Sequence, residues 1–209
     1  MAATALLLTL LFLVTCGVLV DMHAPRMFDK EKLHAIANET LELEGSAARV
    51  DHVVAALEAA YPGHIHGDIP WLFVNCGGWM ASMKLLHASL TEYVLIFAVP
   101  LGAKGHSGRY AIQVTDFMMA GEFKQVPDGS IDVNVYHAGD GIVHEAWSAT
   151  NIDFAPGSMA LEIGSGIVPT SLPFALGDQL LSAQDFPTIA KYFYYYGICV
   201  VSELLQGKI

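Results

Sequence analysis

Two predicted strands within His87–Phe123 constrain the fold most, because a glycine-rich loop joins them. Ser89–Val99 is rich in Val, Ile, Tyr and Phe, residues that suit a pleated, half-buried surface. The loop Pro100–Gly108 contains turn and breaker residues. The second strand alternates, so one face carries an acid among apolar and aromatic side chains: Tyr110, Ile112, Val114, Asp116 and Met118. The pattern predicts a β-hairpin whose buried face includes a carboxyl group.

Asp116 and Glu162 are the two acidic residues that the strand patterns single out. In the predicted strand Met159–Ile163, the face of Glu162 carries Ala160 and Gly164, and such small neighbours leave the space that a ligand cavity needs. A buried carboxylate is costly unless it is hydrogen-bonded, paired or protonated. Asp116 is therefore either a structural hydrogen-bonding partner or a functional acid. Glu162 is either a cavity acid or an ordinary surface charge.

Further short strands follow the hairpin, with turns at Gly139–Gly141 and Pro156-Gly157. Many short strands at this spacing indicate a sandwich or a barrel. Two helices are predicted before the strands, and two after them. We expect a mainly β fold with flanking helices. The strands are Ser130–His137, Ile142–Trp147, Ala149–Phe154 and Met159–Ile163, and the helices are Phe28–Glu44, Ala47–Ala60, Phe174–Ser182 and Pro187–Leu205.

Both ends of the chain suggest contact with a membrane. Ala2–Val20 carries no charge, and about twenty apolar residues span a bilayer. An uncleaved anchor is favoured over a signal peptide, because nothing basic precedes the run and the following residues make a poor cleavage site. The aromatic run Tyr192–Tyr196 suits the membrane–water interface, with burial under the barrel as the alternative. The predicted division is 1–22 as a transmembrane anchor, 23–173 as helices plus barrel, and 174–209 as membrane-associated helices.

Charge and histidine spacing exclude several classes of function. The net charge is −11 with ten Lys plus Arg, so we expect no nucleic-acid partner. With 54% hydrophobic and 15% charged residues, the composition favours a membrane or a lipid-like ligand. His64 and His66 form an HxH pair, but Pro70 stands where a cupin-type site carries a glutamate, and two ligands are too few. We expect no metal and no cofactor. Three other histidines are interpreted as structural: His106, His137 and His144.

Several long blocks, in order along the chain, carry a resemblance to a known family. They include WLFVNCGGWM, LLHASLTEYVLIF, GHSGRY, the TDF–GEF stretch, LEIGSG and IVPTSLPFALGDQLLSAQDF. From about Met27 to its C-terminal helices, the chain resembles the fungal sterol delta-eight to delta-seven isomerases and the animal sigma non-opioid receptors. The MFDKEKL segment looks more like the isomerase branch, whereas WLFVNCGGWM and GHSGRY look more like the receptor branch.

The resemblance implies a cupin-like β-barrel with an N-terminal transmembrane helix and two C-terminal helices against the membrane. It also implies homotrimers in the endoplasmic reticulum membrane and an occluded hydrophobic cavity. Asp116 and Glu162 would carry ligand binding and catalysis, and Tyr93 would hydrogen-bond a carboxylate. The expected cavity wall also includes Trp79, Phe97, Tyr110, Val114 and Met118.

The favoured function is that of a sterol isomerase, which moves a ring double bond by carboxylate acid/base chemistry through a carbocation. An apolar cavity keeps water from that cation and lets one acid stay protonated near neutral pH. The alternative is a non-catalytic binder of hydrophobic amines or sterols, with Glu162 pairing the ammonium. A third interpretation is a structural trimer with an empty core.

Overall fold

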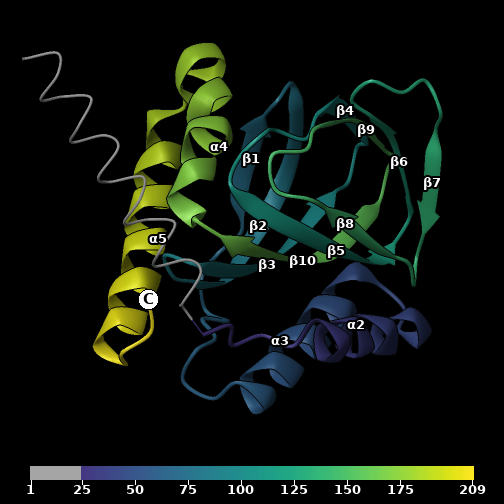
Figure 1. Ribbon diagram of the computed structural model, residues 1–209. Helices are drawn as coiled ribbons and strands as arrows, with labels where there is room; N and C mark the ends of the chain where they lie inside the picture. The colour runs from purple at the N-terminus through teal and green to yellow at the C-terminus, as the bar shows by residue number, and fades with distance from the viewer. Residues whose placement is uncertain (1–24) are drawn as a thin grey trace, which may run out of the picture.

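The computed structural model describes residues 25–209, so the predicted anchor over residues 1–22 lies outside the described part. Within 25–209, none of the helices combines the length and the apolar character that crossing a bilayer requires. Ten strands form two sheets, and helices flank them on two sides (Figure 1). A mainly β fold with flanking helices is therefore confirmed.

The six-stranded sheet has the order β1-β2-β3-β10-β5-β8, and every neighbouring pair is antiparallel. A four-stranded sheet, β4-β9-β6-β7, faces it across the core. The strands of the first sheet are β1 (Leu72–Cys76), β2 (Trp79–Ala88), β3 (Glu92–Val99), β10 (Ser158–Gly166), β5 (Ile112–Ala120) and β8 (Gly141–His144). Those of the second are β4 (Ala103–His106), β9 (Thr150–Phe154), β6 (Glu122–Pro127) and β7 (Asn134–His137).

The predicted hairpin is wrong, because β3 and β5 do not pair with each other. Strand β10 lies between them and pairs with both. The glycine-rich loop contains β4, which joins the other sheet by pairing with β9. The crossing of the chain to the second sheet thus separates β3 from β5 and leaves a place for β10. Glu162 and Asp116 consequently become direct neighbours in the sheet.

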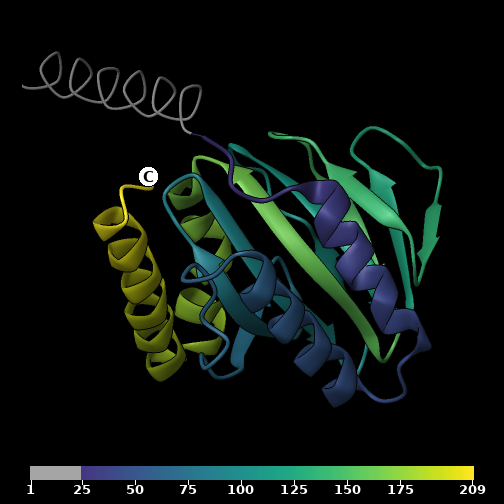
Figure 2. The same cartoon turned by 90° about the horizontal axis from the view of Figure 1, so that it is seen from below.

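Both faces of the central strands are buried, for different reasons. On the outer face, Leu161 and Ile163 pack with Phe117 against the two N-terminal helices, α2 (Lys30–Glu39) and α3 (Ser46–Ala60). Figure 2 shows these two helices lying across that face. The side chain of Asp29 caps α2, as it accepts hydrogen bonds from the amides of Glu31 and Lys32. The short helix η1 (Thr40–Glu42) continues α2.

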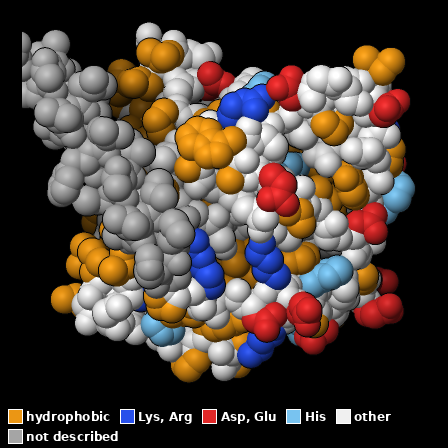
Figure 3. Space-filling model, in the orientation of Figure 1, with side chains coloured by type: hydrophobic (Ala, Val, Ile, Leu, Met, Phe, Trp, Pro, Cys, Tyr) orange, Lys and Arg blue, Asp and Glu red, His pale blue; other side chains and the backbone are white. Residues whose placement is uncertain are grey.

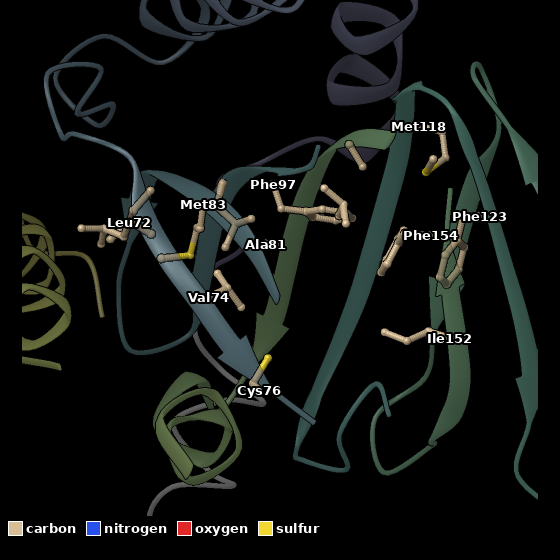
Figure 4. Close-up of a cluster of buried hydrophobic side chains, with 14 of the residues drawn as sticks. Leu72, Val74, Cys76, Ala81, Met83, Phe97, Met118, Phe123, Ile152 and Phe154 are labelled. Atoms are coloured by element: carbon tan, nitrogen blue, oxygen red, sulfur yellow. The ribbon is translucent and has the colours of Figure 1, made fainter. Parts of the chain in front are cut away.

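The inner face builds the core between the two sheets. Side chains from β1 and β2 point toward those of β6 and β9, as Figure 4 shows for Val74, Met83, Phe123 and Phe154. Because apolar side chains from every direction meet here, burial from water drives the closure of the sheets. The same interior contains the acid-bearing face that the alternation of the second predicted strand indicated.

The C-terminal helices stand beside β1 and close one side of the barrel (Figure 1). They comprise η2 (Val168–Ser171), α4 (Leu172–Asp178), the π-helical turn η3 (Gln179–Ala183) and α5 (Phe186–Leu205). One face of α5 packs on the barrel through Cys199 and Tyr196. Its other face exposes apolar side chains: Phe193, Tyr194, Ile198, Val201, Leu204 and Leu205. Thus α5 is neither wholly buried nor wholly free of the barrel.

Candidate functional site

A cavity of about 180 Å³ lies inside the barrel and is lined almost entirely by apolar side chains. Strands of both sheets form most of its wall, and α4 and α5 close the side next to β1. Of the eight residues that the sequence analysis expected here, seven line the cavity: Trp79, Tyr93, Phe97, Tyr110, Val114, Asp116 and Glu162. Met118 lies outside the lining and is fully buried in the adjoining core.

Two parallel rows of side chains cross the sheet and build the polar centre of the site. In one row the register aligns Ile142, Asp116, Glu162 and Leu95 across β8, β5, β10 and β3. In the next row it aligns His144, Val114, Gly164 and Tyr93 across the same strands. Because side chains two residues apart on a strand share a face, both rows point into the barrel. Long side chains of one row can therefore reach the acids of the other.

Asp116 and Glu162 are direct cross-strand partners on β5 and β10. Such partners have Cβ atoms about 4.5–5.5 Å apart, which brings two carboxyl groups into contact. Asp116 is 5% exposed, while Glu162 keeps some accessible surface toward the cavity. The two acids therefore sit together in a nearly dry site, where both cannot be charged without a large cost.

Burial raises the pKa of Glu162 well above its ordinary value. The charge of Asp116 raises this pKa further, the Tyr93 hydroxyl lowers it, and a hydrogen bond with Asp116 raises it again. One atom, Oδ1 of Asp116, is buried and has no partner among the N–H and O–H groups of residues 25–209. The raised pKa favours a protonated Glu162, whose hydroxyl could donate a hydrogen bond to this oxygen.

Tyr93 orients Glu162 from the neighbouring strand. Its hydroxyl donates a hydrogen bond to Oε1 of Glu162 at 2.6 Å. Burial, together with the charge of Glu162, raises the pKa of Tyr93, so the phenol stays protonated and remains a donor. Its ring lies over Gly164, where an added Cβ would come within 2.1 Å of the ring. Only glycine at position 164 leaves room for this contact.

His144 approaches the acid pair from the opposite end of the rows. Its Nε2 lies 3.1 Å from Oδ2 of Asp116, and its ring meets Phe123 edge-on at 6.1 Å. The side chain is 14% exposed and lines the cavity. The sequence analysis interpreted His144 as structural, but the structure gives it a direct contact with the candidate acid.

Aromatic rings form the remaining wall. Trp79, Phe97 and Phe154 pack together, and the Trp79–Phe154 centroids are 5.6 Å apart. At the helical side, the ring of Phe174 on α4 lies 5.7 Å from Tyr110. Gly77 and Gly108 make room for Phe174, since a Cβ at either position would come within 3 Å of its ring. The helices thus close the cavity by close packing, together with hydrogen bonds to the barrel such as the one that Asp178 of α4 accepts from the Gly78 amide.

Several lining residues had no signal in the sequence. A four-residue strand such as β8 is too short for its pattern to show which way His144 points. Phe174 and Tyr192 reach the cavity from the C-terminal helices, which are distant in sequence from most of the strands that line it. Glycines at 77, 108 and 164 were visible only as breaks or small neighbours.

The HxH pair does not enter the cavity. His64 lies with its Nδ1 2.9 Å from Glu203 of α5, and the backbone amide of His66 bonds to Leu86. Within residues 25–209, no three His, Cys, Asp or Glu side chains gather as metal ligands would.

Comparisons with solved structures return cupins, at low similarity. A predicted oxalate decarboxylase from Thermotoga maritima superimposes with a TM-score of 0.42 at 14% identity, over 49% of this chain and 97% of that protein. An RmlC-like cupin from Shewanella frigidimarina gives a TM-score of 0.37 at 19% identity, over 43% of this chain and 78% of that one. These values are too low to support any argument about the site.

Sequence comparisons are more specific. Sigma non-opioid intracellular receptor 1 of Danio rerio is 41% identical over 87% of this chain and 81% of its own length. The Gallus gallus protein of that name is 45% identical over 72% of each chain. The C-8 sterol isomerase ERG2 of Gibberella zeae is 31% identical over 88% of this chain and 79% of its own. Residues 4–208 also match the family described as "ERG2 and Sigma1 receptor like protein", and this chain belongs to that family.

Proposed function

We propose that this chain binds hydrophobic molecules that carry a positive charge, such as amphiphilic amines, in the cavity of its barrel. The observation that carries the proposal is a buried acid pair without a lysine or arginine beside it among the described lining residues. A pair that shares one proton keeps one negative charge, which a ligand cation can neutralise.

The physical argument rests on the dryness of the cavity. At an effective dielectric constant near 20, a cation about 4 Å from a carboxylate gains about 4 kcal/mol. Apolar arms on the ligand would bury against Trp79, Phe97 and Phe154, at about 25 cal/mol per Å² removed from water. An apolar cation therefore matches the cavity better than a neutral lipid or a polar cation.

Relatives favour a receptor-like function over an enzymatic one. The receptors among them are 38–45% identical to this chain, whereas the sterol isomerase is 31% identical. We therefore place receptor-like binding of an amine first.

A second candidate is sterol isomerisation, and the raised pKa of Glu162 favours it. Moving a ring double bond needs one proton delivered to a carbon and another removed from a neighbouring carbon. A protonated acid beside an ionised one supplies both functions, and the ionised acid stabilises the carbocation between the two steps. In this mechanism Glu162 and Asp116 are the acid/base pair, and Tyr93 orients Glu162.

We also propose that the protein is anchored in the endoplasmic reticulum membrane as a homotrimer. The apolar, uncharged run at Ala2–Val20 and the exposed apolar face of α5 support contact with a bilayer. Figure 3 shows hydrophobic side chains on the side of the molecule where α4 and α5 lie. Cross-linking of the full chain in native membranes, read as a trimer band, tests the assembly.

Calorimetric binding to the full chain in lipid nanodiscs tests the ligand class. The probe is N-phenylbutylpiperidine, and phenylbutylcyclohexane is its neutral isostere. We expect the amine to bind about 100-fold more tightly than the isostere, and Glu162→Gln to remove that preference. Glu44→Gln, which removes an exposed acid, is the matched control. Equal affinity for the two probes would contradict the proposal.

Expression in cells that lack their own isomerase distinguishes the second candidate. A delta-seven product formed from a delta-eight sterol, and lost in both Glu162→Gln and Asp116→Asn, would establish isomerisation. Amine binding without any delta-seven product would establish the receptor-like function alone.

A further inference from the structure

We propose that His144 is the positioning residue of the acid pair: it fixes Asp116 so that one carboxyl oxygen is held by the imidazole and the other is left to share a proton with Glu162. The inference deepens the proposed function, on which it rests, by naming what keeps the pair at one negative charge.

The arrangement of the two rows supports this role. Tyr93 and His144 stand at opposite ends of one row, and each reaches diagonally to an acid in the next. The Tyr93 hydroxyl donates to Oε1 of Glu162, and Nε2 of His144 lies 3.1 Å from Oδ2 of Asp116. Each acid thus has one donor of its own, on the side away from its partner.

The hydrogen bonds of Asp116 show which of its two oxygens is left for Glu162. Oδ2 of Asp116 is occupied by His144, while Oδ1 is buried without an N–H or O–H partner in the described chain. A carboxylate whose one oxygen is held cannot rotate freely, so Oδ1 is directed to the only acid beside it. A charge-assisted hydrogen bond in a site of low dielectric is worth more than the same bond in water.

Among the described residues around the cavity, no other side chain donates to Asp116 in place of His144. On the side of β6 the imidazole meets the ring of Phe123, which has no hydrogen to donate. The Tyr110 hydroxyl donates to the carbonyl of Ser107 at 3.1 Å. Besides His144 itself, the titratable groups that line the cavity are Asp116 on β5, Glu162 on β10, Tyr93 on β3, Cys76 on β1, Tyr192 and Tyr196 on α5, and Tyr110.

Without the hydrogen bond from His144, ionised Asp116 is less stable, so the pair should keep two protons up to a higher pH. A pair with two protons is neutral and lacks the negative charge that attracts a cation. The variants are His144→Leu, which removes the donor, and His144→Gln, whose amide can donate in its place. His137→Leu, at an exposed histidine of β7, is the matched control.

Two readouts are followed from about pH 5 to about pH 9. One is the affinity of the full chain in nanodiscs for N-phenylbutylpiperidine. The other, made without ligand, is the infrared band of the protonated carboxyl, assigned to the pair by its loss in Glu162→Gln. In His144→Leu we expect the acidic limb of both profiles to move up by about one pH unit, with about fivefold weaker amine binding at the wild-type midpoint. His144→Gln should restore most of this shift, and His137→Leu should leave the wild-type profile unchanged.

A purely structural role would weaken binding equally at every pH and would leave the infrared midpoint in place, which would overturn the inference. Equal shifts in the Leu and Gln variants, or a downward shift in His144→Leu, would overturn it as well. Absence of amine binding by the wild-type chain, together with the expected infrared shift, would reject the proposed ligand class and support the role of His144.

Discussion

The molecule buries acids in two places, and the two differ in what neutralises them. In the cavity, Asp116 and Glu162 face each other with a tyrosine and a histidine as donors. At the end of α5, Glu92 is fully buried against the ammonium of Lys208, and its carboxylate also accepts the amide of Met27. We call Glu92, Lys208, Glu203 and His64 the rim cluster.

The comparison separates structural acids from functional ones. At Glu92 the chain supplies the opposite charge through Lys208, so this acid ties the end of the chain and the segment before α2 to the barrel. In the cavity no lysine or arginine lies among the described lining residues, so in the proposed complex the ligand would supply the positive charge. Burial alone does not distinguish the two sites; the nearest cation does. The following predictions can break or sharpen this distinction.

Glu92→Gln should have the largest effect, a loss of about 3–5 kcal/mol in the free energy of unfolding, because it leaves the Lys208 ammonium buried without its partner. Urea titration of the full chain measures this change. The double variant Glu92→Gln/Lys208→Met should recover part of the loss, because it removes both charges. An unchanged midpoint in the single variant would show that the rim cluster is not structural.

Gly164→Ala should weaken amine binding by about 10-fold to 100-fold, equivalent to about 1.4–2.7 kcal/mol. The new methyl group collides with the ring of Tyr93, which must leave Glu162. Gly197→Ala is the control, because nothing lies within 4 Å of its Cβ position on α5. That control should keep its affinity and gain up to about 1 kcal/mol of stability from better helix propensity. Wild-type affinity in Gly164→Ala would remove Tyr93 from the site.

Glu203→Gln should cost about 1.5 kcal/mol of unfolding free energy, less than Glu92→Gln. The amide oxygen can still accept from His64, whose Nδ1 lies 2.9 Å from the carboxylate. His87 also approaches Glu203, at 3.6 Å, but burial lowers the pKa of His87 to about 3, so it is neutral and loses no ion pair. Thermal unfolding of both variants side by side measures the ranking, and a larger loss in Glu203→Gln would reverse it.

The last prediction is a pH dependence of stability whose sign follows from the raised pKa of Glu162. The pKa of Glu162 is raised in the folded protein above its value in the unfolded chain. The folded state therefore binds more protons than the unfolded state once pH exceeds the unfolded value near 4.5, and stability falls as pH rises toward the folded pKa. Relative to Glu162→Gln, the wild type should lose stability as the pH rises above the unfolded value near 4.5, until Glu162 ionises in the folded protein. A difference that does not change with pH would show that Glu162 is not protonated in the folded protein.

The elements of this fold were more predictable from sequence than their pairing. Alternation placed Asp116 on an inward face, and small neighbours marked the face of Glu162. Apolar spacing located the helices, and the resemblance supplied Tyr93. The order β3-β10-β5 could not be read locally, because residues more than sixty positions apart in the chain become neighbours. Strand β4 was hidden by Gly105 and by the glycines on either side of it, and His144 by the shortness of β8, since four residues carry too little pattern to fix a face.

The backbone hydrogen bonds between β5 and β10 limit which parts of the cavity wall can vary. Since Asp116 and Glu162 are bound to opposite positions of one hydrogen-bonded ladder, their spacing cannot widen or narrow without unzipping the middle of the sheet. In the proposed complex, ligands of different lengths would therefore differ in their contacts with the other wall, where Phe174 of α4 and Tyr192 of α5 line the cavity. The charged end of such a ligand would meet two acids at a fixed spacing, and its apolar end would meet the aromatic side chains of α4 and α5.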